Sequence, residues 1–140
     1  MAAPVALITG AGIGIGRAIA RRFTADGYRV VVTDVLKREG ERLARQLARS
    51  GEAAFHYLDV ADSDNVDEVV AAVEKQYRRA IDVLVNNAGI TRTMPLETMT
   101  DADWELIHDV DLKGMLRVVR AAAPRMRKAR RGAIVCLSSI

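Results

Sequence analysis

A glycine-rich segment near the start of the chain has the residue types that could hold a phosphate group. Residues 9–16 read Thr-Gly-Ala-Gly-Ile-Gly-Ile-Gly. An apolar run, 5–8, precedes them, and apolar residues recur at helical spacing in 17–23. A glycine turn between a buried strand and a helix lets the backbone approach a ligand, and the helix start supplies free N–H groups and a positive dipole end. The segment therefore predicts a turn that binds a pyrophosphate.

The spacing of the glycines narrows the kind of loop. The usual G-x-G-x-x-G pattern is not met, because Arg17 stands where its third glycine would be. The phosphate loop of an NTPase is excluded as well, since no Gly-Lys-Ser or Gly-Lys-Thr follows. The segment fits Thr-Gly-x-x-x-Gly-x-Gly, with glycines at Gly10, Gly14 and Gly16.

Acidic residues follow the second and third apolar runs. Asp34 comes directly after 30–33, where a carboxylate can accept hydrogen bonds from an adenosine ribose and repel a 2′-phosphate. A helix-capping or loop aspartate is the alternative interpretation. Lys37 and Arg38 follow closely and could soften a preference for the unphosphorylated cofactor. Asp59 follows the third run, where a carboxylate can bond an adenine amino group.

Two adjacent amides, Asn86 and Asn87, end the fourth apolar run and are followed by Ala88 and Gly89. Asparagine side chains bond backbone groups, and Ala-Gly leaves room for a flat ring or a sugar. An ordinary Asn-rich turn is the alternative. Together with the glycine segment, these residues indicate a nucleotide site at the ends of several strands.

Strand and helix patterns alternate along the chain and would position these residues. With 140 residues, half of them hydrophobic, the chain can bury a core, and we expect one domain, 1–140. Short runs rich in Val, Ile and Leu predict strands at 4–9, 28–34, 53–58, 81–86 and 133–138. Helical spacing predicts helices at 14–26, 36–50, 63–78, 101–110 and 112–130. Five such units with short connections predict an α/β fold with a doubly wound parallel sheet of Rossmann type.

The predicted helix 112–130 is apolar almost all round and strongly basic. One apolar face would pack on the sheet, and a second could meet a partner helix, so we expect a homo-oligomer. Pro124 should kink this helix or end its regular part. Residues 112–140 hold eight Lys or Arg and no acidic residue, which could form a nucleic-acid patch. No aromatic residues are interleaved, so cations set against the helix dipole are favoured, and no nucleic-acid partner is expected.

The remaining composition indicates a cytoplasmic protein. The single cysteine, Cys136, lies in an apolar run, cannot form an intrachain disulfide, and is expected to be a small buried hydrophobe. The first apolar run is too short for a signal peptide or a membrane span, so no membrane association is expected. We also expect no metal site.

These motifs together resemble a known family. Thr9-Gly10-x-x-x-Gly14-x-Gly16, Asp59-Val60, Asn86-Asn87-Ala88-Gly89 and a final Ser138-Ser139 occur in the order and at the intervals of the short-chain dehydrogenase/reductase family. The resemblance covers essentially the whole chain, which looks like the first part of such an enzyme. Residues 87–92, Asn-Ala-Gly-Ile-Thr-Arg, resemble the 3-oxoacyl-acyl-carrier-protein reductase branch in particular.

The resemblance implies a role for each matching residue. The pyrophosphate would lie on the glycine segment, at Gly10, Gly12, Ile13, Gly14, Ile15 and Gly16. Asp34 would select NAD over NADP, and Asp59 and Val60 would hold the adenine. The ribose and nicotinamide would lie along Asn87, Ala88 and Gly89. Ser139 corresponds to the catalytic serine, which would hydrogen-bond the carbonyl of an alcohol or ketone substrate.

The chain departs from the family pattern at two places. Asp111 stands where the family has an asparagine that anchors a proton-relay water, so Asp111 would hold that water differently or share a proton. No Tyr-x-x-x-Lys pair is present, so we expect the sheet to be incomplete on its C-terminal side and the 140 residues alone to be inactive.

Three functions remain to be weighed. An NAD-dependent alcohol dehydrogenase or ketone reductase, at the level of the complete protein, is the leading hypothesis. A non-catalytic nucleotide-binding module is the alternative. A methyltransferase with a similar sheet is disfavoured by the Asn-Asn-Ala-Gly segment.

Overall fold

Five parallel strands form one sheet in the computed structural model, which describes residues 2–138. The strands are β1 (Val5–Ile8), β2 (Arg29–Asp34), β3 (Ala53–Tyr57), β4 (Val83–Asn86) and β5 (Ala133–Cys136). Their spatial order is β3-β2-β1-β4-β5, so successive crossovers run outward in opposite directions from β1. The predicted doubly wound parallel sheet is confirmed, and the crevice where the order reverses, between β1 and β4, is where such sheets bind ligands.

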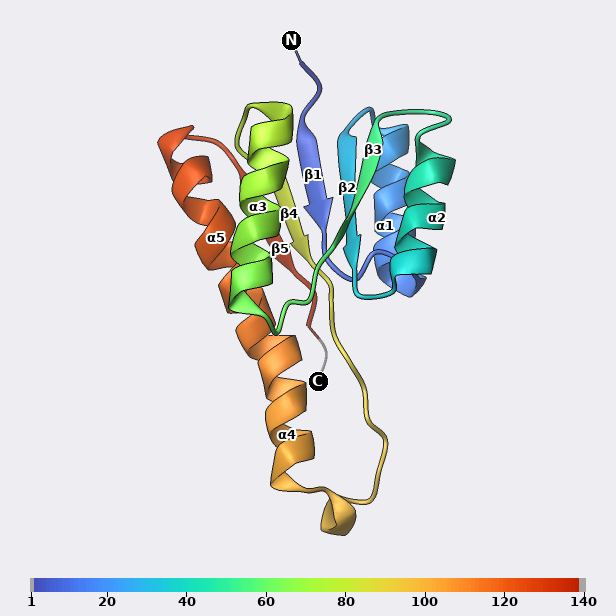
Figure 1. Ribbon diagram of the computed structural model, residues 1–140, viewed down its shortest axis with the longest axis vertical. Helices are drawn as coiled ribbons and strands as arrows, with labels where there is room; N and C mark the ends of the chain where they lie inside the picture. Colours follow the sequence, from blue (N-terminus) through green and yellow to red (C-terminus); the bar gives the residue numbers. More distant parts are fainter. Residues whose placement is uncertain (1, 139–140) are drawn as a thin grey trace.

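Helices cover both faces of the sheet (Figure 1). The covering helices are α1 (Gly14–Ala25) and α2 (Lys37–Leu47) on one face, and α3 (Ser63–Tyr77) and α5 (Gly114–Lys128) on the other. Helix α4 (Asp101–His108) projects beyond the sheet (Figure 1). Alternate residues of β1 face opposite cores: Leu7 packs with residues of α3 and α5, whereas Ile8 packs with residues of α1 and α2. All four residues of β1 are almost fully buried, as expected for the central strand of a three-layer sandwich.

The starts of two helices are fixed by capping side chains. Asp62 accepts hydrogen bonds from the backbone N–H groups of Asp64 and Asn65 at the start of α3. Thr100 and Asp103 form a reciprocal capping box at the start of α4. Both caps bond backbone N–H groups of the first helical turn, which have no partner within the helix.

The helices predicted at 101–110 and 112–130 are joined end to end. A π-helical turn, Asp109–Lys113, connects α4 to α5, and α5 continues through Pro124 to Lys128. Helical backbone is thus kept from α4 to Lys128, and Pro124 does not end α5. Gly114 lets α5 pack on Val60, since a Cβ at Gly114 would lie 2.7 Å from Val60 Cγ2. The connection between β4 and α4 is long, contrary to the expectation of short connections: residues 87–100 hold only a 3₁₀ turn, Leu96–Thr98.

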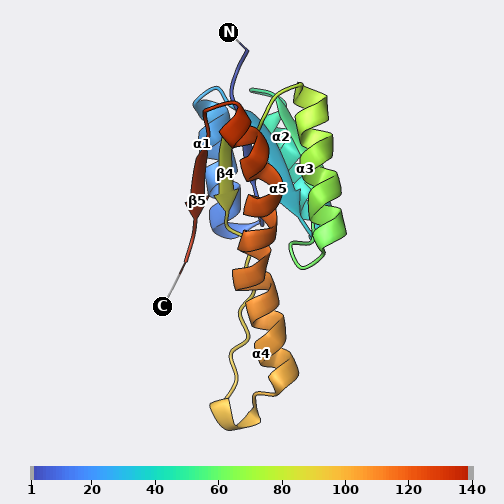
Figure 2. The ribbon, with the colours of Figure 1, turned by 90° about the vertical axis from the view of Figure 1, so that its left-hand side faces the viewer.

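The strand β5 lies at the edge of the sheet and is exposed (Figure 2). It pairs with β4, from Val83 opposite Ala133 to Asn86 opposite Cys136. Cys136 is a free, exposed thiol, so the prediction of a buried cysteine is wrong. The sequence run is apolar as predicted, but burial depends on what covers a strand, and all four residues of β5 are exposed among residues 2–138. Within the same residues, no helix is both long and apolar enough to cross a bilayer.

We expect the exposed β5 edge to make the 140-residue protein self-associate. Ile134 and Val135 are 41% and 49% exposed beside unpaired backbone groups, which favours edge-to-edge pairing. Val135→Lys should lower the association constant by at least about tenfold, since lysine on an edge opposes pairing. The measurement is sedimentation velocity. Leu116→Lys, on an exposed position of α5, is the control: if it alone gives monomers, α5 rather than β5 is the interface.

Candidate functional site

A cleft of about 870 Å³ opens at the carboxyl ends of β1, β2 and β4. Most of the residues predicted to bind the cofactor line it: Gly10, Ile13, Gly14, Ile15, Asp34, Asp59, Val60, Asn87, Ala88 and Gly89. Gly12 and Gly16 do not line the cleft, but Gly12 lies against Asp34 and Gly16 lies against Gly10, which do. The catalytic prediction at Ser139 lies outside the described residues. The topology therefore brings segments that are far apart in the sequence to one edge of the sheet.

The glycines of the loop after β1 serve two different purposes. Gly10 has φ of +62° and Gly14 has φ of +55°, both in the left-handed region that favours glycine. A Cβ at Gly10 would lie 2.7 Å from Ala88 Cα, whereas a Cβ at Gly14 would have no neighbour within 4 Å among residues 2–138. Gly10 thus permits packing against the segment that follows β4, and Gly14 leaves open space at the cleft. Gly16 permits the loop to close, since its Cβ would lie 2.3 Å from Gly10 O.

Two side chains tie this loop to the end of β4. The Thr9 hydroxyl accepts hydrogen bonds from the backbone N–H groups of Asn87 and Ala88, both at 3.0 Å. The Asn87 amide nitrogen donates to Thr9 O at 3.0 Å and to Gly10 O at 2.9 Å. Asn87 therefore holds the loop in place, and its amide N–H donors are already used by backbone carbonyls. The sequence indicated Asn87 but gave no reason to single out the side chain of Thr9.

The start of α1 has the features needed to hold an anion. Its N-cap is Ile13, and no side chain within residues 2–138 caps it, in contrast to α3 and α4. The first turn of a helix carries N–H groups without intrahelical partners, and the dipole there is positive. Gly14 and Ile15 are exposed beside the cleft. These donors fit the pyrophosphate of a dinucleotide, and their fit does not depend on any charged side chain.

Asp34 is buried at the end of β2, with 6% of its surface exposed. Oδ2 accepts a hydrogen bond from Gly12 N at 2.8 Å, and Oδ1 accepts one from Leu36 N at 2.9 Å. A Cβ at Gly12 would lie 3.0 Å from the same Oδ2. Both carboxylate oxygens thus hold backbone in place, and Asp34 also lines the cleft. The carboxylate can accept further hydrogen bonds there, as a ribose hydroxyl requires.

Asp59 and Val60 form the adjacent wall, after β3. The backbone N–H of Asp59 donates to Asn65 Oδ1 at 2.8 Å, and Asp59 Oδ1 accepts from Ala61 N at 2.9 Å. These two bonds fix the turn into α3 and orient the carboxylate. Val60 is buried against Gly114, so its position depends on α5.

Asp111, predicted to act in proton relay, lies in the π-helical turn and accepts a hydrogen bond from Ile90 N at 2.8 Å. It does not line the cleft. A Cβ at Gly89 would lie 3.3 Å from its Oδ1. In this structure Asp111 positions the 89–90 backbone.

Arg117 is a further residue that sequence reasoning missed. Its guanidinium bonds Asp109 Oδ1 at 2.7 Å, Asp109 O at 3.0 Å, Val60 O at 3.3 Å and Ser63 Oγ at 3.1 Å. The hydrogen bond from Arg117 lowers the pKa of Asp109, so Asp109 stays ionised. This arginine joins the π-helical turn to the wall formed by Val60. Its position within a basic helix gave no sign of this role.

Comparison with known proteins decides the family. The model of the short chain dehydrogenase family matches residues 4–140. The chain belongs to the short chain dehydrogenase family. It is 42% identical over 137 residues to the 3-oxoacyl-acyl-carrier-protein reductase FabG of Thermotoga maritima, and 39% identical to the FabG of Staphylococcus aureus. Those matches cover 97% and 96% of this chain but 55% of each relative, so the chain spans about half the length of these curated relatives.

Solved structures of short-chain dehydrogenases have the same fold. A metagenomic short-chain oxidoreductase in complex with NADP matches with a TM-score of 0.92 and 40% identity, covering 98% of this chain and 62% of that one. A short-chain dehydrogenase from Streptomyces avermitilis matches with a TM-score of 0.87 and 37% identity, covering 99% of this chain and 50% of that one. The resemblance read from the motifs is thus confirmed.

Proposed function

We propose that the complete protein is an NAD(P)-dependent oxidoreductase that transfers a hydride between a nicotinamide cofactor and a secondary alcohol or ketone. The observation that carries this proposal is the cleft itself. Three features lie along one cleft: the start of α1, which no side chain within residues 2–138 caps, the open space at Gly14, and the Asp34 carboxylate. The first two would receive the pyrophosphate of a dinucleotide, and Asp34 would receive the adenosine ribose. The cofactor supplies the hydride chemistry, and the protein supplies binding and orientation.

The residues of this chain divide that work. Gly10, Gly14 and Gly16 shape the loop that would receive the pyrophosphate, and Asn87 holds the loop to β4. Asp59 and Val60 would receive the adenine. Ala88 and Gly89 would lie along the nicotinamide side, on backbone that Asp111 positions.

The substrate contact belongs to the proposal as well. Ser139 would bond the substrate oxygen and stabilise the charge that develops there. The names of the relatives point to a 3-oxoacyl thioester as the substrate of the complete protein. We place the complete protein in the cytoplasm, as a homo-oligomer formed through 112–130. The 140 residues alone are proposed to bind cofactor without turnover. A non-catalytic dinucleotide-binding module is the second candidate, and turnover by the complete protein separates the two.

We expect the complete protein to prefer NADH over NADPH by at least about tenfold in kcat/KM, about 1.4 kcal/mol. The reason is that a 2′-phosphate would face the buried Asp34 carboxylate. The measurement is the steady-state reduction of a 3-oxoacyl thioester with each cofactor. Asp34→Asn removes the charge and keeps one acceptor oxygen, so it should reduce the ratio of kcat/KM with NADH to kcat/KM with NADPH. Equal efficiency with both cofactors in the parent protein would contradict the role given to Asp34, and Lys37 and Arg38 would then be the residues to replace.

A further inference from the structure

A second pocket, of about 120 Å³, lies behind the glycine loop, between α1 and α2. It shares no lining residue with the cleft. Its lining residues are Gly12, Arg17, Arg21, Glu39, Arg42, Leu43 and Gln46. Since a liquid water occupies about 30 Å³, the volume corresponds to roughly four waters, enough for a small oxyanion with part of its hydration.

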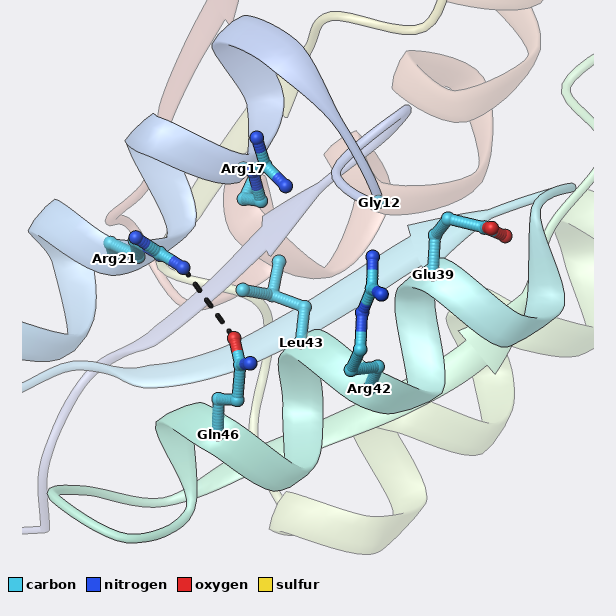
Figure 3. Close-up of a pocket in the computed structure, with 7 residues that line it drawn as sticks. All are labelled: Gly12, Arg17, Arg21, Glu39, Arg42, Leu43 and Gln46. Atoms are coloured by element: carbon cyan, nitrogen blue, oxygen red, sulfur yellow. Dashed lines mark hydrogen bonds between the residues drawn. The ribbon is translucent and has the colours of Figure 1, made fainter.

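Three arginines from two helices meet at this pocket (Figure 3). Arg17 and Arg21 are one helical turn apart on the same face of α1, where like charges repel. Arg42 approaches from α2, across the buried side chain of Leu43. Helix packing therefore brings together three guanidinium groups that the sequence separates.

The positive charge is not neutralised by the protein within residues 2–138. None of the three arginines forms an ion pair there, although nine ion pairs are formed elsewhere. Arg21 donates to the neutral amide of Gln46 at 3.4 Å. Among the described residues, Glu39 supplies the single carboxylate in the lining, and its side chain points away from the guanidinium groups in Figure 3.

We propose that this pocket is an anion site that binds a phosphomonoester, through Arg17, Arg21 and Arg42. Guanidinium groups present paired N–H donors that match phosphate oxygens, and a dianion would relieve the repulsion among the three cations. The phosphomonoester is a free one, bound separately from the cofactor. The Gly12 backbone separates the pocket from Asp34, since its N–H donates to Asp34 Oδ2. The site goes beyond the proposed function and does not require turnover.

The test compares inorganic phosphate with chloride at equal ionic strength, by calorimetric titration and thermal unfolding of the protein. Phosphate should bind the parent protein and raise its unfolding midpoint. Arg42→Ala should weaken phosphate binding about tenfold or more, because a charge-assisted hydrogen bond is lost. Arg45→Ala is the matched control: Arg45 lies on α2, is exposed, and pairs with Glu41 outside this pocket. It should bind phosphate as the parent does. Both arginines are exposed, so folding is not at risk.

Competition with cofactor separates this pocket from the cofactor cleft. Phosphate should bind the parent protein without displacing NADH or NADPH. Displacement of NADPH but not NADH would make the pocket part of the cofactor site and overturn the proposal. Displacement of NADH and NADPH alike would place the anion on the glycine loop and overturn the proposal. So would the absence of phosphate binding, or equal losses in Arg42→Ala and Arg45→Ala. Failure of both cofactors to bind would overturn the proposed function and leave the anion site intact.

Discussion

Gly14→Val is expected to weaken dinucleotide binding about 100-fold or more while the sheet stays folded. In the part of the chain that the structure describes, a Cβ at Gly14 meets no atom within 4 Å. The added side chain therefore enters the open space beside the cleft that a pyrophosphate would need. The left-handed φ of +55° adds strain of about 1–2 kcal/mol, which lowers the free energy of unfolding without abolishing the fold. The measurement is calorimetric titration with NADH.

Gly27→Val is the matched control for this prediction. Gly27 also has a left-handed φ, +84°, and open space around its Cβ, but it lies in the turn between α1 and β2, remote from the cleft. Both variants should lose similar stability in chemical unfolding, and Gly14→Val alone should lose binding. Normal affinity in Gly14→Val, or an equal loss in Gly27→Val, would contradict the assignment of the loop.

Thr9→Val is expected to lower the free energy of unfolding by about 2–4 kcal/mol, because two backbone N–H groups lose their acceptor. The hydroxyl of Thr9, which is 1% exposed, accepts from Asn87 N and Ala88 N. Valine has the same shape and no oxygen, so packing is preserved and the hydrogen bonds are removed. Urea unfolding followed by circular dichroism measures the change. Loosening of the loop should weaken NADH binding in parallel.

Thr9→Ser separates the hydroxyl from the methyl group. Serine keeps the acceptor, so it should restore most of the stability and the binding that valine loses. If serine is as destabilising as valine, the methyl group of Thr9 contributes as much as its hydroxyl, and the hydrogen bonds alone do not hold the loop to β4.

The fold class and most of the cleft follow from local sequence pattern. Strands such as β1 are short apolar runs because both faces are buried, and this pattern is visible without any tertiary information. Gly10, Gly14 and Asp34 could be identified because their spacing from the strand ends is fixed by backbone geometry. These residues line the cleft as expected, although their contacts with a cofactor stay predictions.

Other features depend on contacts between distant residues and could not be predicted. Cys136 lies in an apolar run of the sequence, but its exposure depends on the position of β5 at the edge of the sheet. The role of Thr9 depends on hydrogen bonds to residues 78 and 79 positions later in the chain. The π-helical turn forms where Arg117 binds Asp109 and Asp111 binds Ile90. The spacing of apolar residues in the sequence does not predict such bonds.

Amide hydrogen exchange with and without NADH tests the central claim, that the cleft at the strand ends is the dinucleotide site. Bound NADH should slow exchange in peptides that cover 9–16 and 86–90, with a smaller effect around Asp34 and 58–60. Peptides from the far ends of the same elements, such as 48–52, should be unchanged. Protection absent from the glycine loop, or confined to segments outside the cleft, would contradict this account.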